Sequence, residues 1–160
     1  MNNTKPVVLI TGVTSGIGRA TAGYLASKGM NVFGTVIEPV DGIQLHQDGY
    51  SILSMDVRDT ESVRFAVNRV LEAAQRIDVL INNAGLLKNK PFTELTHEDL
   101  SSCYQVNVIG VIETVQAAVS KMEVNGGHIV NISSMGGFQG SVKFAGLSAY
   151  STSKAAVCSF

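Results

Sequence analysis

The chain has 160 residues, of which 45% are hydrophobic and 16% charged, and its formal net charge is −1. This composition excludes a disordered chain and suits one globular domain over residues 1–160. Its 12 basic and 13 acidic residues are mixed along the chain, which argues against nucleic acid and against an anionic membrane as partners.

The first residues and the two cysteines bear on where in the cell the protein is located. The N-terminus runs directly into a short apolar segment without the pattern of a signal peptide, and no run approaches the roughly 18 apolar residues of a membrane helix. Cys103 and Cys158 lie far apart in apolar, helix-like segments. We expect two reduced, buried thiols rather than a disulfide, and a soluble cytoplasmic protein.

Strands and helices alternate in the first part of the chain. Residues 7–10 are an apolar run without alternation, which is typical of a strand covered on both faces in a parallel sheet. A helix is predicted over 16–28 and a second strand over 31–37. Residues 38–49 have no clean period and are predicted as a loop with at most one helical turn. A third strand follows over 51–55.

The same alternation continues to the last residue. Asp59 is expected to cap a helix with one apolar face. Thr96 and Asp99 resemble a capping box, which opens a long helix to about residue 122. A final helix is expected from Ala149 onward. The remaining strands are predicted over residues 79–82 and 128–132.

This order of elements predicts a doubly wound parallel sheet between two layers of helices, a three-layer α/β/α fold. In such a sheet the ligand lies beyond the carboxyl ends of the strands, where the strand order reverses. The chemically informative residues of the sequence fall at those ends.

A glycine-rich segment follows the first strand, with Gly12, Gly16 and Gly18 at the start of the first helix. Glycines let the backbone approach a pyrophosphate closely, and the helix N-terminus favours an anion. The alternative is an ordinary glycine turn. The spacing alone therefore favours nucleotide binding without establishing it.

Polar residues end two later strands. Asn82 and Asn83 precede Ala84 and Gly85, where the amides either bridge strands or face a ligand. Ser133 and Ser134 follow the strand over 128–132, and a serine in this place forms a turn as often as it takes part in catalysis.

Tyr150 and Lys154 are four residues apart, which places a phenol and an ammonium one turn apart on the same helix face. A free phenol has a pKa of about 10, and a fixed cation beside it favours the phenolate. Asn107 lies on the apolar face of the long helix, where a buried amide must be hydrogen-bonded. Either it ties that helix to a strand, or it holds a water near Lys154.

In combination, these residues resemble the classical short-chain dehydrogenase/reductase family in type, order and approximate spacing. The resemblance covers the whole chain and implies a Rossmann fold. The residues that carry it are Thr11, Gly12, Gly16, Ile17, Gly18, Asp56, Asn82 to Gly85, Asn107, Ser134, Tyr150 and Lys154.

The resemblance implies an oxidoreductase that transfers a hydride between a nicotinamide cofactor and a secondary alcohol or ketone. Tyr150 would be the general acid/base, and Lys154 would stabilise its phenolate and bind the nicotinamide ribose. Ser134 would orient the substrate oxygen, and Asn107 would hold a water that connects Lys154 to solvent. The implied cofactor contacts are Thr11, Gly12, Thr14, Ser15, Gly16, Ile17, Gly18, Asp56, Val57, Asn83, Ala84, Gly85, Tyr150 and Lys154.

The cofactor expected is NAD or NADP, with no metal. The end of the second strand normally chooses between them, through an acidic residue for the ribose diol or a basic one for the 2′-phosphate. That position is Val36, followed closely by Glu38, whose carboxylate would repel a 2′-phosphate if it points inward. Ser15 is neutral where some NADP users carry Arg or Lys, while Arg19 is available for a phosphate. NAD is mildly favoured, and NADP stays open.

Two features depart from the family pattern. Tyr150 follows Ser134 by 16 positions (150 − 134), so the loop between Gly136 and Ser148 is a few residues longer than usual and Ser141 is a lesser candidate for the catalytic serine. Family members are also considerably longer than this chain. We expect a chain cut off before its last strands and substrate lid, which by itself would be unstable, weakly binding or inactive.

Two alternatives stay beside the main interpretation. An extended-type relative would carry a different glycine spacing, and a non-catalytic or inactive nucleotide-binding fragment would share the fold. The resemblance further implies a small alcohol or carbonyl substrate and a homo-oligomer, a dimer or tetramer, for the complete protein.

Overall fold

The computed structural model describes residues 5–122 and 126–160, and its strands form one six-stranded sheet in the order β3-β4-β2-β1-β5-β6. Every strand pairing is parallel except that of β3 with β4. The doubly wound α/β prediction is therefore confirmed, with one antiparallel strand at an edge. The strands are β1 Val7–Ile10, β2 Asn31–Val36, β3 Gln44–Leu45, β4 Ser51–Ser54, β5 Val79–Asn82 and β6 His128–Asn131.

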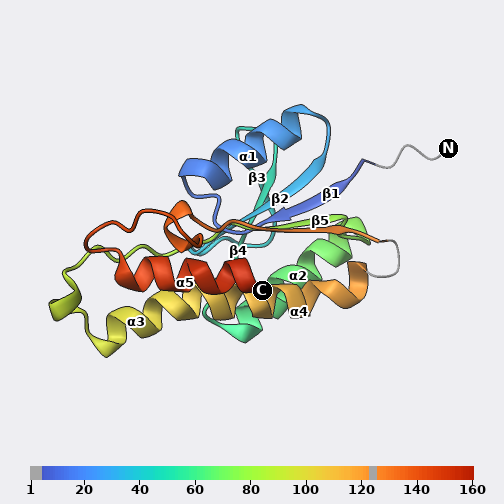
Figure 1. The fold of residues 1–160 in the computed structure, drawn as a ribbon. Coiled ribbons are helices and arrows are strands. Elements are labelled where there is room, and N and C mark those ends of the chain that lie inside the picture. Colours follow the sequence, from blue (N-terminus) through green and yellow to red (C-terminus); the bar gives the residue numbers. More distant parts are fainter. Residues whose placement is uncertain (1–4, 123–125) are drawn as a thin grey trace.

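Helices cover both faces of this sheet, and Figure 1 shows α1 on one side with α2, α4 and α5 on the other. The α-helices are α1 Gly16–Ser27, α2 Thr60–Ala74, α3 His97–Tyr104, α4 Gly110–Met122 and α5 Ser148–Ser159. Three short elements complete the path: the 3-10 turns η1 Phe92–Glu94 and η3 Met135–Gly137, and the π-helix η2 Gln105–Ile109.

Two predicted helix caps are present. The Asp59 side chain accepts hydrogen bonds from the backbone N–H groups of Glu61 and Ser62 at the start of α2. Thr96 and Asp99 form a reciprocal capping box at the start of α3. Each cap satisfies donors that the first helical turn leaves unpaired, which is why these helices begin where the sequence indicates.

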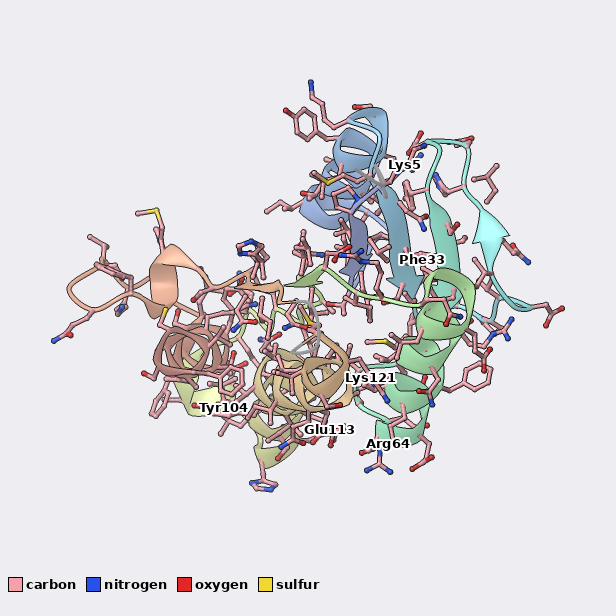
Figure 2. All side chains as sticks on the ribbon, turned by 90° about the vertical axis from the view of Figure 1, so that its right-hand side faces the viewer. Lys5, Phe33, Arg64, Tyr104, Glu113 and Lys121 are labelled. Atoms are coloured by element: carbon pink, nitrogen blue, oxygen red, sulfur yellow. The ribbon has the colours of Figure 1, made fainter. Side chains whose placement is uncertain are left out.

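The sheet separates two apolar clusters, because alternate residues of each strand point to opposite faces. On one face Leu9, Phe33 and Leu80 pack with α2 and α4. On the other face Val8 and Ile10 pack with α1. Figure 2 looks at the molecule from another side and shows Arg64 and Glu113 on the outer surface of the α2–α4 layer, where both line one shallow depression.

The connection over residues 38–49, predicted as a loop, contains the short strand β3. The prediction was wrong here because the segment folds back in a tight turn, in which His46 N donates to Tyr50 O at 2.7 Å and Gly49 N donates to His46 O at 2.9 Å. The His46 ring stacks on the Tyr50 ring with centroids 4.6 Å apart. The turn directs Gln44 and Leu45 antiparallel to β4.

The long helix expected from residue 96 to 122 is interrupted by η2, so its prediction as one regular helix was wrong. A π-turn accommodates one additional residue per turn and is often found at functional sites. Asn107 lies within it and is fully buried. The interruption therefore coincides with a candidate site residue.

β6 is the other edge of the sheet, since it pairs only with β5 among the described residues. Its Ile129 and Val130 side chains are 40% and 41% exposed, although equivalent positions on β1 are fully buried. An edge strand with apolar side chains in solvent is a surface prone to pairing.

Leu80 offers a test of the packing, because it is fully buried at the centre of the α2–α4 face. Leu80→Ala should lower the free energy of unfolding by about 3 kcal/mol, through lost burial and the cavity left behind. Urea unfolding followed by circular dichroism measures this. Leu45→Ala, at a side chain that is 80% exposed, should change little, and equal losses from both variants would contradict the described core.

Candidate functional site

A cavity of about 540 Å³ opens at the carboxyl ends of five parallel strands. β1 lies between β2 and β5, so successive connections leave it in opposite directions and the strand order reverses there. This is the place where a doubly wound sheet binds its ligand. The predicted site residues on the cavity wall are Gly12, Thr14, Ser15, Ile17, Gly18, Asp56, Val57, Asn83, Ala84, Gly85, Tyr150 and Lys154.

The glycine turn between β1 and α1 packs closely against the loop after β5. Gly12 has φ +72°, and a Cβ there would lie 2.8 Å from the Ala84 Cα. A Cβ on Gly18 would overlap the Gly12 carbonyl oxygen. Glycine is required at both positions because neither leaves room for a side chain.

Thr11 and Asn83 hold this turn in place through their side chains, a role that the sequence had left open for Asn83 and had not indicated for Thr11. Thr11 Oγ1 accepts from the backbone N–H groups of Asn83 at 3.0 Å and Ala84 at 2.9 Å. In return, Asn83 Nδ2 donates to Thr11 O at 2.9 Å and Gly12 O at 2.8 Å. The asparagines were expected either to bridge strands or to face a ligand, and these side-chain contacts match the bridging role. Asn82 likewise donates to Asn131 Oδ1 on β6 at 2.9 Å.

The start of α1 has the properties of an anion site. Its N-cap Ser15 makes no side-chain hydrogen bond to the helix, so the first N–H groups are left for another acceptor. Nothing lies within 4 Å of the position that a Cβ on Gly16 would occupy. Free helix N–H groups beside open space suit the pyrophosphate of a dinucleotide.

Lys154 lies almost completely buried beside this cavity, with 3% of its surface exposed. Its Nζ donates to Ile132 O at 2.6 Å, at the end of β6. Burial lowers the pKa of Lys154, because desolvation disfavours its charged form. Tyr150, one helical turn away, is half-buried and shares the cavity wall. An ammonium has three donors, so Lys154 keeps hydrogen-bonding capacity toward the cavity.

Asn107 fastens the π-helix to the loop after β5 and to α5. Its Nδ2 donates to Leu86 O at 2.9 Å and to Ser153 Oγ at 2.8 Å, and its Oδ1 accepts from Leu86 N at 2.8 Å. Ser153 Oγ in turn donates to Tyr150 O at 2.8 Å. Both amide hydrogens are used in ties between elements, which was one of the two roles expected for Asn107.

Ser134 does not lie on the wall of the large cavity, whereas Ser133 does. Ser134 Oγ accepts from Gly136 N at 3.2 Å at the start of η3. Ser133 Oγ donates to Lys154 O at 2.8 Å and lies 3.0 Å from the Cys158 Sγ. Ser141, the lesser candidate, donates to Phe138 O within its own loop at 2.7 Å.

The two cysteines differ in environment. Cys103 is buried as predicted, and desolvation raises the pKa of its thiol. Cys158 is exposed, so its prediction as a buried thiol was wrong. It lies near the end of α5, beside the Ser133 hydroxyl.

The structure also shows the contacts of the residues that bear on the choice between NAD and NADP. Glu38 points toward the glycine turn, where its Oε2 accepts from Thr14 Oγ1 at 3.4 Å. Arg19, the candidate for a 2′-phosphate, instead contacts Asp48 at 3.1 Å. Val36 is buried, with 9% of its surface exposed.

Several wall residues were not predicted. They follow the same strand ends as the predicted ones, so the rule that ligands lie at carboxyl ends would have found most of them. The unpredicted residues are Ile37, Arg58, Leu86, Leu87, Val106 and Ile132, and Ser133 also lines the wall although Ser134 had been preferred to it. Conversely, the cavity wall does not include Thr11, Gly16, Asn107 or Ser134, and the first three support or adjoin it from behind.

Arg58 is the most informative of these. Its guanidinium forms a bidentate contact with Asp56, with Nη2 2.6 Å from Oδ2 and Nε 2.9 Å from Oδ1. This hydrogen bond holds the pKa of Asp56 below its usual range. Asp56 is thus kept ionised, as an acceptor, at the cavity wall.

Over residues 5–122 and 126–160, no group of three His, Cys, Asp or Glu side chains is placed to hold a metal ion. Within the same ranges, no helix combines the length and apolar character needed to cross a membrane.

Comparisons with known proteins agree with this geometry. A family model described as short chain dehydrogenase matches residues 6–160. The chain is 38% identical over 152 residues to a 3-ketodihydrosphingosine reductase of Bacteroides thetaiotaomicron, with 94% of this chain and 54% of that protein covered. It is 35% identical to an L-2,3-butanediol dehydrogenase of Corynebacterium glutamicum, with 94% and 61% covered.

A solved structure shows the same fold. A short-chain dehydrogenase from Streptomyces avermitilis superposes with a TM-score of 0.84 at 35% identity, over 98% of this chain and 57% of that one. The chain therefore spans between about half and two thirds of the length of the relatives it matches.

The Arg58–Asp56 pair can be tested directly. Arg58→Gln should raise the pKa of Asp56 toward the ordinary value of 3.8, because its strongest hydrogen-bond donor is lost. A ¹³C NMR titration of the carboxyl group measures this. In the unaltered protein, the stability that Asp56 contributes should be present above its ordinary pKa and be lost as the pH falls through its lowered pKa, and in Arg58→Gln most of this pH-dependent contribution should be absent. Arg64→Gln, which removes a partner of Glu61, is the control, and an unchanged Asp56 titration in Arg58→Gln would refute the pairing.

Proposed function

The chain belongs to the short-chain dehydrogenase family, and from this membership and the site geometry we propose that it forms the cofactor-binding and catalytic part of an oxidoreductase. The enzyme would interconvert a secondary alcohol and a ketone. The observation that carries the proposal is the shared cavity, in which the glycine turn, Tyr150 and Lys154 line one continuous wall.

Members of this family use NAD or NADP, and the cavity fits such a dinucleotide. The open N-terminus of α1 would hold the pyrophosphate, and Asp56 and Val57 would lie along the adenine side. Lys154 and Tyr150, on the opposite part of the wall, would hold the nicotinamide ribose. When bound, the cofactor supplies or accepts the hydride at the carbon that changes oxidation state.

The residues of this chain would move the accompanying proton. Tyr150 Oη would take the hydroxyl proton of an alcohol, or give a proton to the oxygen of a ketone. The Lys154 ammonium, fixed by Ile132 O, would stabilise the phenolate through its charge. Ser134 would donate to the substrate oxygen, since its own oxygen already accepts from Gly136 N.

Asn107 would be a positioning residue in this proposal. Through Ser153 it holds the turn of α5 that carries Tyr150 and Lys154, and through Leu86 it holds the loop after β5. A wrong orientation of α5 would separate the phenol from the nicotinamide, and small misplacements of reacting groups are costly in rate.

NAD is the proposed cofactor. The Glu38 carboxylate beside Thr14 would repel a 2′-phosphate, and Arg19 is engaged with Asp48. An acidic residue near the end of β2 is the usual partner of a free ribose diol.

The proposal includes the setting of the enzyme. Residues 1–160 would form a single nucleotide-binding domain of a cytoplasmic protein. Its partners would be the cofactor, a small alcohol or carbonyl compound and further copies of itself as a dimer or tetramer, with neither nucleic acid nor membrane among them. The names of the two relatives suggest L-2,3-butanediol and 3-ketodihydrosphingosine as first substrate probes.

Removing one hydroxyl tests the catalytic assignment. In the complete enzyme of which this chain would form part, Tyr150→Phe should lower turnover of these probes at least about 100-fold, because the proton donor and acceptor is lost. Binding of NADH, followed by fluorescence titration, should be largely retained. Tyr104→Phe on α3, at an exposed ring, should leave both unchanged. Retained turnover in Tyr150→Phe would end the assignment, whereas cofactor binding without turnover of any secondary alcohol or ketone would favour a non-catalytic module.

The cofactor preference has its own test. Titration with NADH and NADPH should give a lower Kd for NADH. Glu38→Gln should reduce the ratio of the NADPH Kd to the NADH Kd roughly five-fold, as expected for the loss of about 1 kcal/mol of charge repulsion near solvent. Glu61→Gln, on the outer face of α2, should leave the ratio unchanged. Tighter binding of NADPH by the unaltered protein would reverse the preference proposed for Glu38.

A further inference from the structure

One ammonium group ties the loop between η3 and α5, residues 138–147, back to its own start. Lys143 Nζ donates to Gly136 O at 2.9 Å, to Phe138 O at 2.8 Å and to Ser141 Oγ at 2.8 Å. These contacts use all three of its donors. We propose that Lys143 is a positioning residue for Ser134, an inference that rests on the proposed function of Ser134 as the donor to the substrate oxygen.

The connection to Ser134 runs through the tight turn η3. Gly136 N donates to Ser134 Oγ at 3.2 Å, and Gly137 N donates to Ser134 O at 3.0 Å. Gly136 therefore contacts the serine hydroxyl through its N–H and the Lys143 ammonium through its carbonyl. Fixing that residue keeps one lone pair of the Ser134 oxygen occupied and so limits the directions in which the hydroxyl hydrogen can point.

The opposite side of the same turn rests on α5. A Cβ on Gly136 would lie 2.8 Å from Ser151 Oγ, and one on Gly137 would lie 2.6 Å from Ala155 N. The turn is thus enclosed between the helix that carries Tyr150 and the ammonium of Lys143. Without the ammonium, the outer side of the turn would lose its contacts.

Apolar packing does not replace these contacts. The side chains of Phe138, Val142 and Phe144 are 66%, 78% and 61% exposed. A segment that buries few apolar side chains opens easily, so its order depends on its hydrogen bonds. Near its other end, the loop is attached through Lys90 N, which donates to Gly146 O at 2.9 Å.

The loop is also the segment that the spacing of Ser134 and Tyr150 shows to be longer than usual for the family. Lys143 lies within this longer loop and turns back to its start. The longer loop is therefore compatible with a rigid serine because one of its residues closes it on itself.

The first test needs no substrate. Lys143→Met keeps the length of the side chain but removes its donors, so backbone amides of residues 134–142 should exchange with deuterium about ten-fold faster. Lys28→Met, at a surface lysine of α1, is the matched control and should leave this segment unchanged. Unaltered exchange in Lys143→Met would overturn the proposal.

The second test asks whether the effect passes through Ser134. Lys143→Met should lower kcat about ten-fold with little change in KM or in NADH affinity, and Lys143→Gln should be intermediate. In a Ser134→Ala background the same change should have no additional effect on kcat. An undiminished effect in that background would overturn the positioning role.

Different results would contradict the positioning role of Lys143 and the catalytic assignment of Tyr150. If Tyr150→Phe abolishes turnover while Lys143→Met behaves as the unaltered protein, only the role of Lys143 is lost. If Tyr150→Phe keeps full turnover, the catalytic assignment itself is lost, whatever the exchange of the loop shows.

Discussion

Four hydrogen bonds between the end of β1 and the loop after β5 decide where the glycine turn lies. Thr11 Oγ1 accepts hydrogen bonds from two backbone N–H groups, and the Asn83 side-chain amide donates to the carbonyl oxygens of Thr11 and Gly12. Because β1 and β5 are adjacent parallel strands, these bonds close the sheet at its carboxyl edge. The turn can then approach Ala84 closely, and the start of α1 opens toward the cavity. The shape of the site follows from this one connection.

A second set of contacts places the chemistry. Lys154 binds Ile132 O at the end of β6, and Asn107 binds Ser153 and the backbone of Leu86. Together they fix α5 against the strand ends from two sides. The phosphate end of the cavity and its reactive end are thus attached to the sheet through separate residues. If the chain functions as proposed, a change at one end would alter turnover without altering the phosphate cradle at the other, so binding and turnover could be measured separately.

The fold was largely predictable because its signals are local: apolar runs for buried parallel strands, and capping residues such as Asp59 and Thr96 at helix starts. β3 was missed because two residues in a tight turn have no periodicity to detect. The interruption of the long helix was missed because the local sequence keeps its helical pattern there, while the Asn107 contact with Leu86 that accompanies the interruption is distant in sequence. The site was predictable in location, since strand ends identify it, but not in the contacts of Asn83 and Arg58, which depend on three-dimensional neighbours.

The number of residues in the π-helix η2 sets the direction of the Asn107 side chain. Its five residues, Gln105–Ile109, occupy a wider turn than an α-helix provides, and each residue of a regular helix advances the direction of a side chain by about 100°. Deletion of one residue from this segment ahead of Asn107 would leave the asparagine in the sequence but turn its amide away from Leu86. The number of residues in the segment therefore matters as much as their identity. A sequence alignment that omits one of these positions would match the wrong residue to Asn107.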